Sequence, residues 1–203
     1  MSQPHNRACA APQPGEIDED LGEFWVTDPW SINLSHNLSS FERNRFYLNT
    51  QGETFVEASY ISGADSDGDG RCVVPLDYDN DGMQDLLVRQ VGGGPLKLYR
   101  NQLPPQNYLR VRLEGTKSNR LGIGSRLVAH VGDQQIVREL YPHNSFRSQM
   151  ANEVHFGLRG VETLDRLTVT WPSGQVDEWV DLPTNQSIVL TEGRTDSVEP
   201  ALR

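Results

Sequence analysis

The sequence has little cysteine. Its 203 residues include Cys9 and Cys72 and no other cysteine, so neither a disulfide framework nor a paired-cysteine zinc site is expected. A single bridge between the two cysteines stays open. The fold must therefore be held by its core and by polar contacts, together with any ion that it binds.

Long apolar runs are also missing. No stretch approaches the roughly 20 apolar residues that a membrane-spanning helix needs. Residues 1–13 lack the apolar segment of a secretory signal, so we expect either an intracellular protein or a trimmed or mature form. No transmembrane segment is expected in this chain.

Basic residues are outnumbered. Lys and Arg total 18 against 28 Asp and Glu, and the formal net charge is −10. This charge argues against nucleic acid or an anionic membrane surface as the main partner, because both would repel the chain at long range. The acidic residues gather in residues 16–28, which suggest a solvated tail, and in residues 65–85, where repulsion favours a bound cation.

Hydrophobic patterning predicts an all-β protein in four parts. Residues 1–43 show no sustained period and suggest an extended acidic and aromatic arm. Residues 44–103 carry short strand-like runs separated by Asp-rich and Gly-rich turns, at a spacing typical of antiparallel propeller-blade strands. Residues 107–192 predict an antiparallel β-sandwich or barrel, and residues 193–203 a disordered tail.

Regular alternation supports the sandwich or barrel. Leu109, Val111 and Leu113 alternate with charged residues, as in a strand buried on one face. No helical stretch of about 12 residues interrupts the series. Further runs of this kind lie at residues 127–131, 136–141, 154–158, 167–171, 176–180 and 187–190.

A nine-residue loop from Asp77 to Asp85 carries the most specific chemical signal. Carboxylates stand at its positions 1, 3, 5 and 9, and a tight turn at Gly82 would direct them onto one hard cation. Oxygen-only ligation favours Ca²⁺. Position 12, where an EF-hand has glutamate, is Val88, so a strand follows the loop. The predicted ligands are the side chains of Asp77, Asp79, Asp81 and Asp85 and the backbone carbonyl of Met83.

A second Asp-rich loop lies just upstream. Asp65, Asp67 and Asp69 repeat the odd-position spacing, but position 9, where the first loop has a carboxylate, is Val73. A second, weaker metal site, borrowing Asp77 for its missing ligand, and a solvated turn without an ion are both consistent with this ligand count.

The loop around His143 is the candidate binding surface of the second domain. It is polar and aromatic, with Phe146 and Arg147 beside the histidine, although an ordinary solvated crossover also explains such a composition. No nucleophile–base pair, zinc-protease motif or nucleophile elbow is present in the sequence. We therefore expect that the chain is not an enzyme.

Four further motifs follow the loop of Asp77–Asp85. They are Tyr108-Leu-Arg-Val-Arg-Leu-Glu-Gly115, Asn119-Arg-Leu-Gly-Ile-Gly-Ser-Arg126, Val154-His-Phe-Gly-Leu158 and Val169-Thr-Trp-Pro-Ser-Gly174. The loop is similar to that of an FG-GAP/VCBS-type repeat, and the four motifs resemble those of an ASPIC/UnbV domain. Over about residues 44–192 the chain therefore resembles the cartilage acidic protein family.

The resemblance implies a calcium-stabilised β protein, usually extracellular or periplasmic, with adhesion or accessory roles. Family members usually carry enough repeats to close a propeller, whereas this chain has one clear loop and one partial loop, so unpaired strand edges need a cover. We expect a calcium-binding, non-catalytic interaction or adhesion-type module. The alternative is an accessory subunit of a larger enzyme, biosynthetic or membrane-associated complex. A protein partner is expected in both cases, and a carbohydrate partner stays open.

Overall fold

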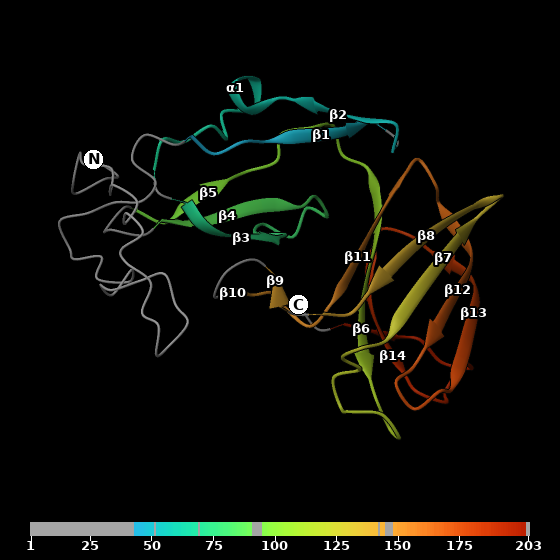
Figure 1. The fold of residues 1–203 in the computed structure, drawn as a ribbon. Coiled ribbons are helices and arrows are strands. Elements are labelled where there is room, and N and C mark those ends of the chain that lie inside the picture. Colours follow the sequence, from blue (N-terminus) through green and yellow to red (C-terminus); the bar gives the residue numbers. More distant parts are fainter. Residues whose placement is uncertain are drawn as a thin grey trace, which may run out of the picture. The chain divides into compact units, whose positions relative to one another are not determined.

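The computed structural model describes residues 43–50, 52–68, 70–90, 95–141, 143–144 and 148–201 (Figure 1). The predicted N-terminal arm therefore lies outside the described residues, apart from Arg43. The described chain is nearly all β, as the patterning predicted, with one short helix, α1. Within it, no helix is long and apolar enough to cross a membrane.

The described residues divide into two compact units. The first contains residues up to Arg71 together with Val88–Lys97, and the second contains Cys72–Leu87 and the residues from Leu98 onward. The Asp77–Asp85 loop thus belongs to the same unit as the strands that follow residue 107.

The blade-like part of the chain consists of short strands. Strands β1 and β2 form a two-stranded antiparallel sheet, α1 follows directly, and the three-stranded sheet has the order β3-β4-β5. The helix ends at Gly63, which adopts the left-handed conformation that terminates helices. The bounds are β1 Tyr47–Thr50, β2 Thr54–Glu57, α1 Ser59–Ser62, β3 Gly70–Leu76, β4 Asp85–Gln90 and β5 Lys97–Tyr99.

The rest of the second unit is a β-sandwich. One four-stranded sheet has the order β11-β6-β14-β15 and the other β13-β12-β7-β8, while β9 and β10 form a separate pair. Figure 1 shows the two larger sheets facing each other. The bounds are β6 Asn107–Glu114, β7 Arg126–Val131, β8 Gln134–Glu139, β9 His143–Asn144, β10 Ser148–Gln149, β11 Val154–Arg159, β12 Thr163–Thr170, β13 Val176–Pro183, β14 Gln186–Thr191 and β15 Glu199–Pro200.

Alternate residues of both sheets build one core. The alternating residues of β6 that the sequence singled out, Leu109, Val111 and Leu113, are all buried. Phe156 of β11 and Trp171, next to the end of β12, are among the largest fully buried side chains. A Leu or Phe buried in this way contributes about 1.5–3 kcal/mol relative to the exposed side chain. The core accounts for a stable sandwich without a disulfide.

The sandwich differs from the antiparallel expectation at one pair. Strands β6 and β14 run parallel, with Leu109 opposite Gln186 and Leu113 opposite Leu190. A parallel pair requires a crossover connection, and here the chain between β6 and β14 forms the four strands of the other sheet, the β9–β10 pair and β11 before it returns. The remaining sandwich pairs with a described register are antiparallel.

The chain end also differs from its expectation. Within the segment predicted as a disordered tail, β15 pairs with β14, with Glu199 opposite Val189. The Ala201 N–H also donates to the Ser187 carbonyl (2.9 Å). Without this short strand, β14 would present an open edge, so its pairing satisfies backbone groups that need partners.

Candidate metal centre

The Asp77–Asp85 loop joins β3 to β4, and Asp85 is the first residue of β4. Asn80 and Gly82 have positive φ angles of 58° and 88°, and these values curl the loop back on itself. A Cβ on Gly82 would lie 2.1 Å from Cε1 of Tyr108. Glycine is therefore required here for its conformation and for its contact, and the predicted turn at this residue is confirmed.

Backbone N–H groups orient the innermost carboxylates. Asp77 accepts hydrogen bonds from Asp81 N and Gly82 N, both at 3.0 Å. Asp85 accepts from Tyr78 N (3.0 Å) and Asn101 N (2.7 Å). These contacts hold the carboxylates at the start and end of the loop in fixed rotamers.

Three of the five predicted ligands come together. One carboxylate oxygen from each of Asp77, Asp79 and Asp85 lies within 4.8 Å of the others. Calcium–oxygen distances are about 2.3–2.6 Å, so oxygens bound to one ion are at most about 5 Å apart. The donor set, all oxygen, and its spacing fit a calcium ion.

The other two predicted ligands have different surroundings. Asp81 Oδ1 accepts a hydrogen bond from Met83 N (2.8 Å), and the Asp81 side chain is not part of the three-carboxylate group. Met83 is half-buried at position 7 of the loop. Its carbonyl as a ligand stays a prediction.

Two arginines compensate the negative charge of the loop. The Arg100 guanidinium lies 2.6 Å from Asp79 Oδ2 and 3.8 Å from Asp81 Oδ2. Arg110 Nη2 lies 3.6 Å from Asp77 Oδ2 and donates to Asn80 Oδ1 at 3.4 Å. The Arg110 side chain is 11% exposed and that of Asp77 is 0% exposed, so this pair is shielded from water. Arg100 is exposed, and its attraction is weaker for the same separation.

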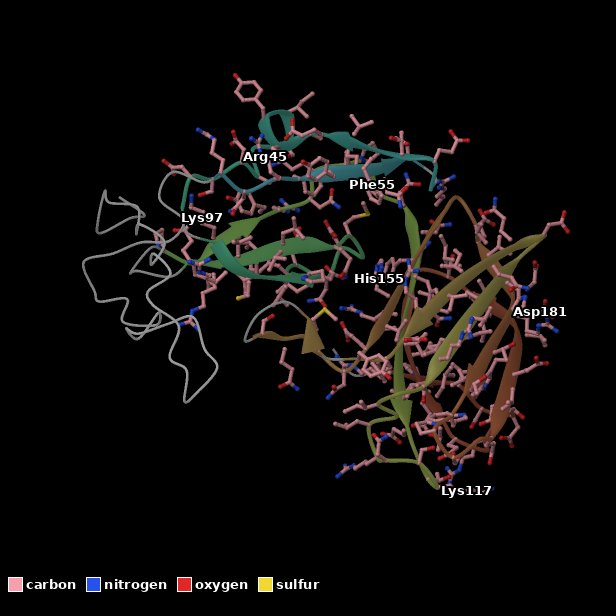
Figure 2. All side chains as sticks on the ribbon, viewed as in Figure 1. Arg45, Phe55, Lys97, Lys117, His155 and Asp181 are labelled. Carbon is pink, nitrogen blue, oxygen red and sulfur yellow. The ribbon has the colours of Figure 1, made fainter. Side chains whose placement is uncertain are left out.

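Strands β6 and β11 contact the loop on the side of Gly82. His155 of β11, labelled in Figure 2, lies 2.9 Å through Nε2 from the Gly82 carbonyl oxygen. Its ring stacks on that of Tyr108, with centroids 5.8 Å apart and an interplanar angle of 6°. Burial lowers the pKa of His155, although the hydrogen bond to Gly82 acts in the opposite direction. The neutral ring is therefore favoured at pH 7.

Alternation and spacing did not reveal these contacting residues. Tyr108 and Arg110 stand on the polar side of an alternating strand, where solvent exposure is the ordinary expectation. His155 lies 73 residues from Gly82 in the sequence. The available signal was the motif Val154-His-Phe-Gly-Leu158, in which a histidine interrupts an otherwise apolar run.

The second Asp-rich loop shows no comparable group among its described residues. Asp65 pairs with Arg43 at 3.0 Å, and Asp69 lies outside the described part of the chain. Near this loop, Ser66 Oγ accepts hydrogen bonds from Gln90 Nε2 (3.1 Å) and Lys97 Nζ (2.5 Å). The second metal site therefore stays a prediction.

The candidate binding loop falls largely outside the described residues. Phe146 and Arg147 are not described, and only the backbone of His143 is, in β9. Cys9 is likewise outside, while Cys72 is a free thiol.

Two protein-family models match the chain. The FG-GAP-like repeat matches residues 26–88 and includes the Asp77–Asp85 loop. The ASPIC and UnbV model matches residues 115–197 and includes β7 to β14. A search of curated proteins finds no match. The chain therefore contains an FG-GAP-like repeat followed by an ASPIC/UnbV domain, an architecture that fits a non-catalytic interaction or adhesion-type module.

Proposed function

We propose that the chain is a calcium-stabilised, non-catalytic interaction module, and that Asp77, Asp79 and Asp85 hold the ion with Asp81 and the Met83 carbonyl. The observation that carries the proposal is the three-carboxylate group within 4.8 Å in a loop that turns at a glycine. The match to an FG-GAP-like repeat supports it, since such repeats often bind calcium. The motif resemblance further favours kinship with the cartilage acidic protein family.

The proposed ion has a structural role. The loop joins two neighbouring strands of the sheet β3-β4-β5, and a divalent ion would neutralise the negative charge that Arg100 and Arg110 leave uncompensated among its four aspartates. Binding to the folded state alone would stabilise that state by about 2.7 kcal/mol when calcium is at 100 times Kd. For a chain of this size the stabilisation corresponds to a Tm increase of about 5–10 °C.

Thermal unfolding in calcium and in chelator tests this role. We expect calcium to raise the Tm of the unmodified chain and Asp79→Asn to weaken binding by at least about tenfold. Asp79 suits the test because its described contact is with the exposed Arg100, so the variant should fold. Asp133→Asn in the β7–β8 turn is the matched control and should keep the full response. Equal Tm values for the unmodified chain in both buffers would contradict the proposal.

A specific surface favours the accessory-subunit alternative. The β1–β2 hairpin places Leu48 opposite Val56 on one face and Tyr47 diagonally across from Phe55 on the other. All four side chains are exposed, with Phe55 at 66%. A two-stranded sheet with apolar residues on both faces is marginal in water and is typical of a surface that a partner covers.

Co-purification from the native source distinguishes the two roles. An accessory subunit should co-purify with a defined complex, and Phe55→Ser should release it from that complex. Val180→Ser, which also places serine at an exposed apolar strand position but in the sandwich, is the control and should leave the subunit bound. An adhesion-type module should instead be found free or surface-bound. Turnover that is lost on substitution of His143 would contradict the non-catalytic part of the proposal.

A further inference from the structure

The contact between Gly82 and the sandwich falls next to a predicted ligand. The peptide unit that joins Gly82 to Met83 is planar, so the Gly82 oxygen and the Met83 nitrogen turn together. His155 Nε2 holds the oxygen at 2.9 Å, and Asp81 Oδ1 holds the nitrogen at 2.8 Å. The peptide that precedes the Cα atom of Met83 is therefore held at both its oxygen and its nitrogen, and only the φ and ψ angles of Met83 separate it from the Met83 carbonyl.

The histidine is well suited to hold that peptide. A carbonyl oxygen only accepts hydrogen bonds, so Nε2 must carry the proton. Stacking on Tyr108 fixes the plane of the ring, and Tyr108 also lies directly under Gly82. Ring and glycine are thus placed by the same strand, β6.

We propose that His155 is a positioning residue for the calcium loop, through which the ASPIC/UnbV domain sets the affinity of the FG-GAP-like repeat for the ion. This inference rests on the proposed function and adds the dependence of the site on the domain that follows it. His155 touches no ligand atom itself. It acts by fixing the Gly82–Met83 peptide, so that only the φ and ψ angles of Met83 remain free to turn the Met83 carbonyl. Less conformational entropy is then lost when that carbonyl binds the ion.

The coupling must be reciprocal. If His155 strengthens calcium binding, calcium strengthens the hydrogen bond of His155 by the same factor. The ring resonances of His155 in the unmodified chain should therefore shift on addition of calcium. Those of His130, which lies on β7 beside Arg166, should not.

Three variants of the full chain test the inference by calcium titration. His155→Phe keeps a ring for stacking but removes the donor, and Kd should rise about tenfold, as expected for one lost hydrogen bond to a buried carbonyl. His155→Gln places an amide N–H where Nε2 stood, and should restore Kd to within about threefold of the unmodified value. His130→Phe is the matched control and should leave Kd unchanged.

The outcomes separate this inference from the proposed function. Unfolding of each variant in chelator establishes that it folds. If His155 only stabilised the fold, His155→Phe would lower the unfolding free energy in chelator, and His155→Gln would not restore the calcium Kd. Tight calcium binding by the unmodified chain together with an unchanged Kd in His155→Phe would overturn the inference alone. No calcium binding by the unmodified chain would overturn both.

Discussion

Glu192, just after β14, carries the strongest prediction about stability. Its carboxylate accepts hydrogen bonds from the backbone N–H groups of Thr116 (2.8 Å), Lys117 (2.7 Å) and Ser118 (2.8 Å) and from the hydroxyls of Ser118 and Ser173. Glu192 is only 2% exposed. One side chain therefore ties the end of β14 to the β6–β7 loop and to the β12–β13 turn.

Replacement of Glu192 by glutamine should destabilise the fold by about 2–4 kcal/mol at pH 7. The shape is kept, but charge-assisted hydrogen bonds of about 1.5–3 kcal/mol become neutral ones of about 0.5–1.5 kcal/mol. Glu192 Oε2 accepts all three backbone N–H groups and Oε1 accepts the two hydroxyls. In glutamine only the oxygen end of the amide still accepts, so one of these two sets of contacts is lost or must reverse its direction. Glu178→Gln, on the exposed face of β13, is the matched control and should cost under about 1 kcal/mol.

The cost should depend on pH in a defined direction. Burial raises the pKa of Glu192, but the N–H of Ser118, the Ser173 hydroxyl and the two other N–H groups outweigh it and lower the pKa from 4.5 to about 2. A depressed carboxyl pKa contributes stability above pH 4.5 that is lost as the pH falls towards 2. The difference between the unmodified chain and Glu192→Gln should thus shrink below pH 4.5.

Urea unfolding at pH 7, 5 and 3.5 measures this difference. The predicted result is a large gap in unfolding free energy at pH 7 and 5 that narrows at pH 3.5. A gap below about 0.5 kcal/mol at pH 7, or one that is constant over the three pH values, would refute the reasoning from the hydrogen bonds.

Three further changes have defined outcomes. Arg100→Gln should tighten calcium binding about three- to fivefold, because the positive charge of Arg100 beside Asp79 and Asp81 repels the ion by about 1 kcal/mol in water. Since salt screens this repulsion, titration in 1 M salt should abolish the gain in affinity. Gly82→Ala should lower the unfolding free energy measured in urea by about 2–4 kcal/mol, because the new Cβ clashes with Tyr108 and the residue has a positive φ. Gly174→Ala is the control: it also has a positive φ but open space around it, and it should cost about 1 kcal/mol. Leu167→Ala in the core should lower the unfolding free energy by about 2–5 kcal/mol, and a loss under 1 kcal/mol would contradict the assigned packing.

Strand positions followed from alternation, but some boundaries did not. The run predicted at 167–171 overlaps β12, which extends from Thr163 to Thr170, and the run at 176–180 is part of β13, which ends at Pro183. In both strands the buried residues step by three, from Leu164 to Leu167 and from Trp179 to Leu182. In β13 the alternation is interrupted at Asp181, between Trp179 and Leu182, and this residue adopts a positive φ. A period of two cannot find strand residues beyond such an irregularity.

The candidate site was predicted for its local part only. Aspartates at alternate positions and a glycine at the turn are visible within nine residues. The contacts of Arg110 and His155 with the loop join residues 30 and 73 positions apart, and depend on where β6 and β11 place their side chains. The parallel pairing of β6 with β14 could not be predicted either, because alternation shows which face of a strand is buried but not which strand lies next to it.

Calorimetric titration with calcium shows whether the Asp77–Asp85 loop of the unmodified chain binds the ion. We expect saturable binding, and in the same titration Asp79→Asn should bind at least about tenfold more weakly. A calcium site at this loop is ruled out if the unmodified chain takes up no calcium, or if Asp79→Asn binds the ion as tightly as the unmodified chain does.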